Sequence, residues 1–133
     1  MSTCQENELA ARQCVELYNK GTTEWVDTFY AKSAEWTELP TQFAPHGQRG
    51  GRDFLRQKAA RDHAMFPDRQ MHILNLVAQG SQVVLELDWR GTAAASIGPL
   101  KAGTILKIRV ASFFCYADGK IVKQVDYCTL PES

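Results

Sequence analysis

Glycine-containing turns divide the C-terminal half of the chain into long strand-like segments, and this pattern limits the folds open to it. Gly80-Ser81 and Asp118-Gly119 are turn sequences of the kind that close tight β-hairpins. The strands predicted around them are Met71–Gln79, Gln82–Ile97, Thr104–Tyr116 and Lys120–Leu130. The middle two are joined by a longer loop, GPLKAG. Consecutive strands with such short connections predict an antiparallel meander.

The first half of the chain has helical periodicity instead. Helices are predicted over Glu6–Lys20, from Thr22 or Thr23 to Tyr30, and from Arg52 to about Met65. The first carries an apolar stripe at i, i+4, i+7 and i+8, formed by Ala10, Cys14, Leu17 and Tyr18. Gly21 suits a left-handed helix end, and Pro67 stops the third helix. A strand is predicted over Ala34–Leu39 and a loop over 40–51.

Composition narrows the class of protein. The 133 residues fit a single domain, predicted to span 1–133, and 44% hydrophobic with 23% charged residues indicates a globular chain. Fifteen basic residues balance fifteen acidic ones, so no general attraction to nucleic acid or to an anionic membrane is expected. No stretch approaches the roughly 18 apolar residues of a membrane span, and the polar start does not resemble a signal peptide. We therefore expect a cytoplasmic protein that binds a small molecule or another protein.

The cysteines do not have the spacing of a metal site. Cys4, Cys14, Cys115 and Cys128 form no C-x-x-C pair and have no histidine at ligand spacing, so neither a metal nor a cofactor is predicted. In a reducing compartment they are interpreted as thiols that fill core space. A disulfide between Cys115 and Cys128, on adjacent predicted strands, is the alternative.

One carboxylate, Asp126, lies within the apolar last strand, between Val125 and Tyr127. Because burial of a charge costs free energy, Asp126 is expected to be exposed, paired, or held in a cavity where its proton is useful. Strand alternation predicts that it shares a face with Val122, Gln124, Cys128 and Leu130. The opposite face carries Lys123 and an apolar patch of Ile121, Val125 and Tyr127, which predicts a homodimer that pairs through the sheet.

Short motifs in a fixed order accompany this unusual succession of helix, helix, strand, helix and four strands. They are YNKG at 18–21, FYA at 29–31, GRDFL at 51–55, MFPD at 65–68, LDWRGT at 87–92 and DGKIV at 118–122. With these motifs in this order, the chain resembles the SnoaL-like family of the nuclear-transport-factor-2-like superfamily, which includes polyketide cyclases and ketosteroid isomerases. The resemblance implies an α+β, cone-shaped fold with three N-terminal helices on a curved, mainly antiparallel sheet and an internal pocket. Such a fold does not by itself define an activity.

The resemblance also implies catalytic candidates. In SnoaL-like cyclases an aspartate near the end of the sheet acts as acid and base at carbon, and Asp126 falls in the matching stretch. Its apolar neighbours are expected to raise its pKa and to make it a better base. A structural ion pair with Lys123, Arg109 or a helix residue is the alternative.

Glu38 and His46 are the other candidates. Ketosteroid isomerases carry their base in the first strand, one residue before a proline, and Glu38 is displaced from that position only by Leu39. Those isomerases also have a tyrosine in the first helix, where this chain has Cys14, a poor donor. The histidine that SnoaL-like cyclases commonly carry after the Gly-Thr of the long strand is absent after Thr92. His46 lies in a loop that is expected to cover the pocket, where it would shuttle a proton; the alternative for both residues is plain exposure to solvent.

Aromatic side chains favour an apolar ligand. The residues expected to line the pocket are Trp36, Trp89, Phe114 and Tyr116, with ordinary core packing as the alternative. The leading hypothesis is a cofactor-free proton-transfer enzyme of cyclase, isomerase or dehydratase type that acts on a polyketide- or steroid-like compound. A non-catalytic binding protein and a dimerisation module remain as alternatives.

Overall fold

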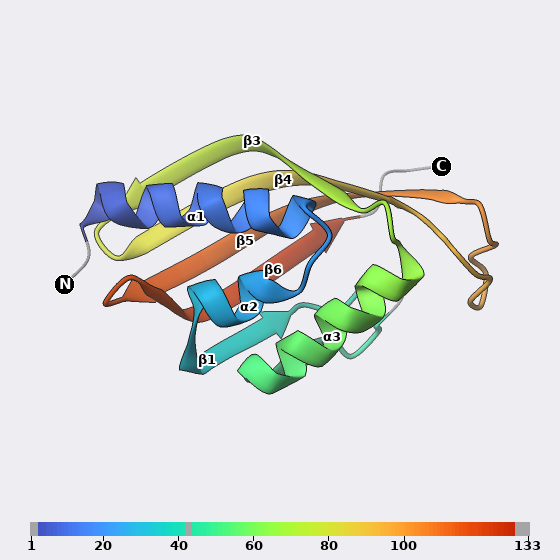
Figure 1. The fold of residues 1–133 in the computed structure, drawn as a ribbon, viewed down its shortest axis with the longest axis horizontal. Helices are drawn as coiled ribbons and strands as arrows, with labels where there is room; N and C mark the ends of the chain where they lie inside the picture. The colour runs from blue at the N-terminus through green and yellow to red at the C-terminus, as the bar shows by residue number, and fades with distance from the viewer. Residues whose placement is uncertain (1–2, 42–43, 130–133) are drawn as a thin grey trace.

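The computed structural model describes residues 3–41 and 44–129, which form helices packed on one curved sheet (Figure 1). The elements are α1 (Cys4–Asn19), α2 (Glu24–Phe29), β1 (Tyr30–Glu38), β2 (Gln48–Gly50), α3 (Arg52–Met65), β3 (Gln70–Gln79), β4 (Gln82–Thr92), β5 (Ile105–Ala117) and β6 (Lys120–Thr129). The sheet has the strand order β2-β1-β6-β5-β4-β3. The predicted α+β class with a mainly antiparallel sheet is confirmed.

The ends of α1 follow from its sequence. Thr3 and Glu6 form a capping box, in which the Thr3 hydroxyl accepts from the Glu6 amide and the Glu6 carboxylate accepts from the Thr3 amide. Beyond Lys20 the chain turns at Gly21, which has a φ of +83° as the sequence predicts. The inner stripe of α1 buries Asn7, Ala11, Cys14, Val15 and Tyr18 and packs against β3 and β4.

The third helix lies where its sequence signals place it. It begins at Arg52 after an extended Gly51 and ends at Met65, before Pro67. Phe66 then packs edge-on against Trp89, with ring centroids 5.1 Å apart. Gly91 leaves the room for this contact, because a Cβ there would lie 2.8 Å from the Cβ of Phe66.

The predicted meander is confirmed, and β1 extends the sheet beyond β6. β3, β4, β5 and β6 pair antiparallel in sequence order, and β1 pairs with β6 in parallel. β1 starts at Tyr30, four residues before the predicted start, because this parallel pairing reaches back to Tyr30. The short strand β2 pairs with the end of β1 inside the predicted loop. β4 ends at Thr92 rather than Ile97, so that residues 93–104 form a longer connection.

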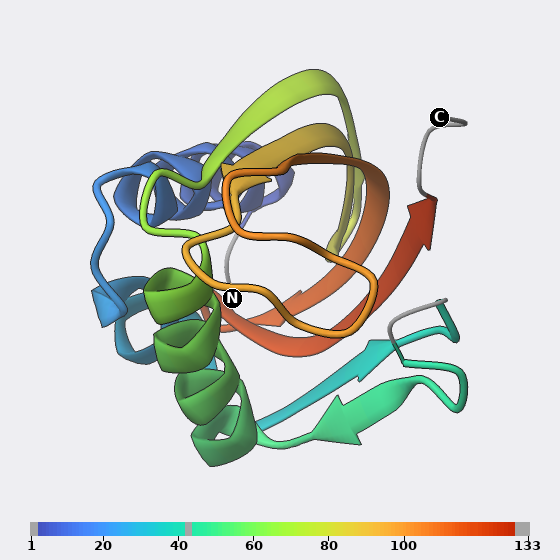
Figure 2. The same ribbon diagram turned by 90° about the vertical axis from the view of Figure 1, so that its right-hand side faces the viewer.

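The sheet curls strongly around its inner face. Figure 2 shows β3 to β6 bending around the interior, with the helices on the concave side and the β4–β5 connection crossing in front of it. The inward residues of β4, which include Val83, Leu85 and Leu87, are buried as alternation predicts. They meet the inner faces of the helices, so the core and the candidate site lie between the helices and the concave face.

A bulge in β6 corrects one predicted face. Cys115 of β5 pairs with Lys123 of β6, but the next residue of β5, Tyr116, pairs with Ile121, so Val122 is an extra residue. Because of this extra residue, the side chains that precede Val122 lie on the opposite faces from those that strict alternation predicts. Ile121 therefore points into the core, where it is fully buried. The prediction that Ile121 belongs to an outer apolar patch is therefore wrong. Leu130 lies outside the described residues.

The predicted disulfide alternative is wrong as well. Cys115 lies opposite Lys123, whereas Cys128 lies opposite Val110 at the other end of the strand pair. All four cysteines are free thiols. Among the described residues, no helix is long and apolar enough to cross a membrane.

The bulge has a measurable consequence for stability. Ile121→Ala should lower the free energy of unfolding by about 2–5 kcal/mol, because it removes buried methyl groups and leaves a cavity. Val125→Ala, at a partly exposed position on the other side of the bulge, is the matched control and should cost less. Urea unfolding of both variants measures the difference. Equal losses would contradict the inward position of Ile121.

Candidate active site

Asp126 is held by three side chains from three strands. Its Oδ2 accepts from the Trp36 indole Nε1 at 2.9 Å, and its Oδ1 accepts from the Ser112 hydroxyl at 2.7 Å. The Gln124 amide donates to both oxygens, at 2.8 and 3.1 Å. Each donor is placed by strand register, since Ser112 pairs with Asp126 across β5 and β6, and Trp36 pairs with Gln124 across β1 and β6.

The Gln124 amide is itself oriented by Tyr30. The hydroxyl of Tyr30 donates to Gln124 Oε1, which leaves the amide nitrogen directed at Asp126. Both side chains are buried. Tyr30 starts β1 and Gln124 lies in β6, so the parallel strand pair positions this contact.

Burial raises the pKa of Asp126 above its ordinary value. The hydrogen bonds from Gln124, Ser112 and Trp36 and the positive charge of Lys58 favour the ionised form, but burial exceeds them. With two donors on each oxygen, the carboxylate has little acceptor capacity left. Asp126 is thus a fixed carboxylate whose geometry is set by its neighbours.

Glu38 lies beside Asp126 at the same level of the sheet. The two residues pair across β1 and β6, and the amide of Leu39 donates to the Asp126 carbonyl at 3.1 Å. Glu38 Oε1 accepts from Gln48 Nε2 at 3.2 Å, and within residues 3–41 and 44–129 the one donor to Oε2 is the weak Cys128 thiol at 3.7 Å. Burial, followed by the charge of Asp126, raises the pKa of Glu38, against an opposing effect of Lys58. Glu38 therefore combines a raised pKa with unused acceptor capacity.

Cys128 completes this corner of the sheet. Burial, with the charges of Glu38 and Asp126, raises the pKa of the Cys128 thiol to about 12. The side chain is therefore a neutral thiol that donates weakly to Glu38, and not a nucleophile.

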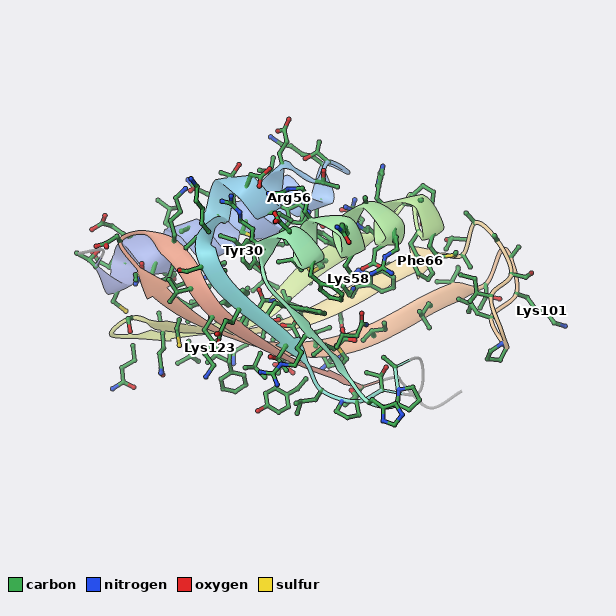
Figure 3. All side chains as sticks on the ribbon, turned by 90° about the horizontal axis from the view of Figure 1, so that it is seen from below. Tyr30, Arg56, Lys58, Phe66, Lys101 and Lys123 are labelled. Atoms are coloured by element: carbon green, nitrogen blue, oxygen red, sulfur yellow. The ribbon has the colours of Figure 1, made fainter. Side chains whose placement is uncertain are left out.

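Two further side chains reach this region, and the sequence analysis missed both. Lys58 points from α3 toward the strands, forms an ion pair with Asp62, and lies 5.5 Å from the centroid of the Trp36 ring (Figure 3). Tyr18 of α1 accepts a hydrogen bond from the Trp89 indole at 2.7 Å. The sequence analysis placed Tyr18 only in the apolar stripe of the first helix and did not consider Lys58. The one available signal was that Tyr18 lies one turn after Cys14 on the same apolar stripe.

The four aromatic candidates belong to one apolar core but make different contacts within it. Trp36 contacts Asp126 directly, and Trp89 joins Tyr18 to Phe66. Phe114 and Tyr116 are buried further along β5, where they pair with Gln124 and Ile121. The Tyr116 hydroxyl is buried without a partner among the described residues.

His46 is separate from the carboxylates. It is exposed in the segment before β2, and among the described residues no hydrogen bond or ion pair joins it to Asp126 or Glu38. Two open depressions also lie elsewhere. One of about 280 Å³ is on the outer sheet face around Val77, Arg109 and Tyr127, and one of about 370 Å³ is beside the start of α3. The described residues contain no cluster of potential metal ligands.

Comparison with known proteins identifies the family. The sequence profile of the SnoaL-like domain matches residues 11–124. The chain belongs to the SnoaL-like domain family. No curated protein matches this SnoaL-like chain in sequence.

Solved structures agree in fold. AclR from Streptomyces galilaeus, a proposed hydroxylase, superposes with a TM-score of 0.82 at 13% identity over 96% of this chain and 81% of its own. IdmH from Streptomyces antibioticus, a proposed polyketide cyclase, has a TM-score of 0.78 at 20% identity over 92% and 91%. An epoxide hydrolase of the LEH-like type from M. tuberculosis has a TM-score of 0.72 at 17% identity over 94% and 84%. At these identities the comparisons show the SnoaL-like fold, which hosts different activities in these proteins.

The raised pKa values predict a pH dependence of stability. The folded protein holds the protons of Asp126 and Glu38 more tightly than the unfolded chain, so stability should fall as the pH rises from ordinary carboxyl pKa values, near 4, through the raised ones. Urea unfolding at several pH values in this window should show that the free energy of unfolding falls less steeply with pH in Asp126→Asn and in Glu38→Gln. Glu35→Gln, on an exposed position of β1, should keep the wild-type slope. Identical slopes in all four proteins would refute the shifts.

Proposed function

We propose that this SnoaL-like protein is a cofactor-free proton-transfer enzyme, of cyclase, isomerase or dehydratase type, that acts on an apolar polyketide- or steroid-like compound. The observation that carries the proposal is the carboxylate pair of Glu38 and Asp126, which face each other across β1 and β6 with raised pKa values. Carboxylates with such values exchange protons closer to neutral pH than ordinary ones do.

The hydrogen bonds divide the roles within the pair. Glu38 has a weak donor on one oxygen, so it is the group that we assign to take the proton from substrate. Asp126 already accepts from three side chains, and its fixed negative charge raises the pKa of Glu38. This assignment reverses the order of the sequence-based hypothesis, in which Asp126 was the acid and base and Glu38 or His46 assisted.

The reaction begins at a carbon next to a carbonyl group. Glu38 takes the proton, so that the C–H bond breaks, an O–H bond forms on the carboxyl group, and the electron pair moves into an enolate. The enolate then regains the proton at another carbon, attacks a second carbonyl of the same molecule to form an alkoxide that takes the proton from Glu38, or expels a β-hydroxyl group that leaves as water with that proton. These three outcomes are isomerisation, cyclisation and dehydration, and none requires an oxidant. The partly buried indole of Trp89 supplies apolar surface for such a ligand, whereas the buried Trp36 indole holds Asp126.

Hydrogen–deuterium exchange into enolisable aromatic ketones tests the proposal. Wild-type protein should accelerate exchange at the carbon next to the carbonyl, and Glu38→Gln should reduce the rate by about 10²–10⁴-fold, the usual contribution of a general base. Glu35→Gln, three residues earlier on an exposed position, should exchange like wild type. Ketone binding without any exchange would contradict the proposal and favour a non-catalytic binding protein.

The pH dependence of the same exchange separates the two carboxylates. The rate should rise as Glu38 loses its proton, and Asp126→Asn should move this rise to lower pH, because it removes the negative charge that raises the pKa of Glu38. The pH–rate profiles of wild type and Asp126→Asn measure the shift. A profile that stays in place, or moves to higher pH, would argue against this coupling.

A homodimer that pairs through the outer sheet face is also proposed. Phe113 and Tyr127 contact each other on that face, and both are nearly half exposed, at 47% and 46%. Tyr127 also lines the depression near Val77, and a second copy related by a twofold axis would cover this apolar surface with its own copy of it. The four free thiols favour a reducing compartment, consistent with the expected cytoplasmic location.

Light scattering after size exclusion tests the dimer. Wild type should run as a dimer at micromolar concentration, and Phe113→Asp and Tyr127→Asp should run as monomers because they place charges in the apolar contact. Leu9→Asp, at an exposed apolar position of α1, is the control and should stay dimeric. A monomeric wild type would overturn the pairing.

A further inference from the structure

Lys58 carries its charge toward the interior, unlike its neighbours on α3. Figure 3 shows Lys58 directed at the strands, whereas Arg56, two residues earlier, points to the outside of the helix. Arg56 forms exposed ion pairs with Asp27 and Asp53. The side chain of Lys58 is only 19% exposed, so its position is not that of an ordinary solvated helix charge.

The Trp36 indole links Lys58 to the carboxylates. The ammonium lies 5.5 Å from the ring centroid, within the range of a cation–π contact, and the N–H of the same ring donates to Asp126. Lys58 also acts electrostatically on Glu38, whose pKa its charge lowers. The Lys58 ammonium and the Asp126 carboxylate therefore both contact one buried indole, and Glu38 pairs with Asp126 beside it.

Lys58 stays charged and keeps donor capacity. Burial alone would lower its pKa, but the charge and hydrogen bond of Asp62, with Glu38 and Tyr18, exceed that effect and raise it. An ammonium has three N–H donors, and among the described residues Asp62 is its single hydrogen-bond acceptor. Asp62 thus holds the ammonium in place without using all of its donors.

We propose that Lys58 binds the carbonyl oxygen of the substrate and stabilises the enolate oxygen that forms on it. This inference rests on the proposed proton transfer and adds the residue that receives the charge. When Glu38 takes a proton, one negative charge leaves the carboxylate and appears on the substrate oxygen, so the net charge of the site does not change. A donor fixed at that oxygen acts on the transition state more strongly than on the neutral ketone.

The charge balance also defines the ligand class. Asp62, Glu38 and Asp126 already supply three carboxylates, against the ammonium of Lys58 and the buried Arg69 guanidinium that lies 4.5 Å from the centroid of the Tyr18 ring. A ligand with a permanent carboxylate would add a further negative charge, whereas a neutral ketone or a phenol that gives its proton to Glu38 would not. The site therefore takes neutral, oxygen-bearing aromatic compounds that can form an oxyanion.

Tyr18 adds a second donor beside Lys58. Its hydroxyl oxygen accepts from Trp89, and its own proton has no acceptor among the hydrogen bonds of the described residues. Tyr18 also interacts with the charges of Lys58 and Asp62, so its hydroxyl lies on the same side of the site. The first helix thus provides a tyrosine one turn beyond Cys14. Cys14 itself is the position at which the ketosteroid isomerases that this chain resembles have a tyrosine.

Binding of two naphthalene probes to the full chain tests the role of Lys58 without requiring catalysis. 2-Naphthol imitates an enolate once it is ionised, whereas 2-methoxynaphthalene has the same rings and cannot ionise. Wild type should bind 2-naphthol more tightly and with the red-shifted absorbance of the naphtholate. Lys58→Met should weaken 2-naphthol by about tenfold or more, the scale of a hydrogen bond to a charged group, and leave 2-methoxynaphthalene unchanged.

Matched variants keep the test decisive. Lys123→Met removes an exposed lysine from the outer face of β6 (Figure 3) and should bind both probes like wild type. Lys58→Arg should retain the preference for 2-naphthol, and Asp62→Asn should strengthen it, because one competing negative charge is lost. These two variants carry the test if Lys58→Met does not fold, which circular dichroism and thermal melting establish.

The outcomes separate this inference from the proposed function. Loss of the 2-naphthol preference in Lys58→Met, with ketone exchange abolished in Glu38→Gln and slowed in Lys58→Met, supports both. Naphtholate binding that depends on Lys58, without any ketone exchange in wild type, supports the anion site and contradicts proton transfer. Equal discrimination by wild type and Lys58→Met, or no binding of either probe, overturns the inference.

Discussion

The parallel pairing of β1 with β6 is the contact on which the site depends. A meander of β3 to β6 alone would present Asp126 on the edge strand of the sheet, where water would solvate it. Adding β1 brings the Trp36 indole onto Asp126, Tyr30 onto Gln124, and Glu38 to the same level as Asp126. The β1–β6 pair thus supplies the Trp36 donor to Asp126, orients the Gln124 donor, and places Glu38 beside Asp126.

Burial and hydrogen bonding then act against each other at Asp126. Three donors favour its charged form, yet removal from water raises its pKa, so the residue is costly to hold and rigid once held. Glu38 is less deeply buried than Asp126 and has fewer donors, and the charge of Asp126 adds to the effect of burial on its pKa. The difference in donor count, rather than in residue type, gives the two carboxylates different chemistry. Lys58 and Asp62 add the opposite charge from the helix side, so that the site is built from α1, α3, β1 and β6 together.

Sequence patterns predicted the frame well where the signals were local. The start of α3 at Arg52, the turns at Gly80 and Gly119, and the inward face of β4 follow from turn chemistry and alternation, which act over a few residues. The prediction was wrong where contacts between residues far apart in the sequence determine the face of a side chain or the start of a strand. Ile121 turns inward because a bulge in β6 accommodates Val122, and β1 begins at Tyr30 because its partner strand is far away in sequence. His46 was grouped with the carboxylates for its loop position and its imidazole, and the structure shows it exposed to solvent.

By itself, the sequence determined the α+β class, the order of elements, the membership of Asp126 in a mostly apolar strand, and the candidacy of Glu38. The class, the order of elements and the apolar strand around Asp126 depend on periodicity and motif order, whereas the candidacy of Glu38 follows from the resemblance to ketosteroid isomerases. Only the tertiary structure decided that Trp36, Ser112 and Gln124 occupy the Asp126 oxygens, that Glu38 keeps free acceptor capacity, and that Lys58 faces the strands. The physical reason is that donor count, burial and charge at a site are sums over residues far apart in sequence, and they are defined once the sheet has curled around the helices.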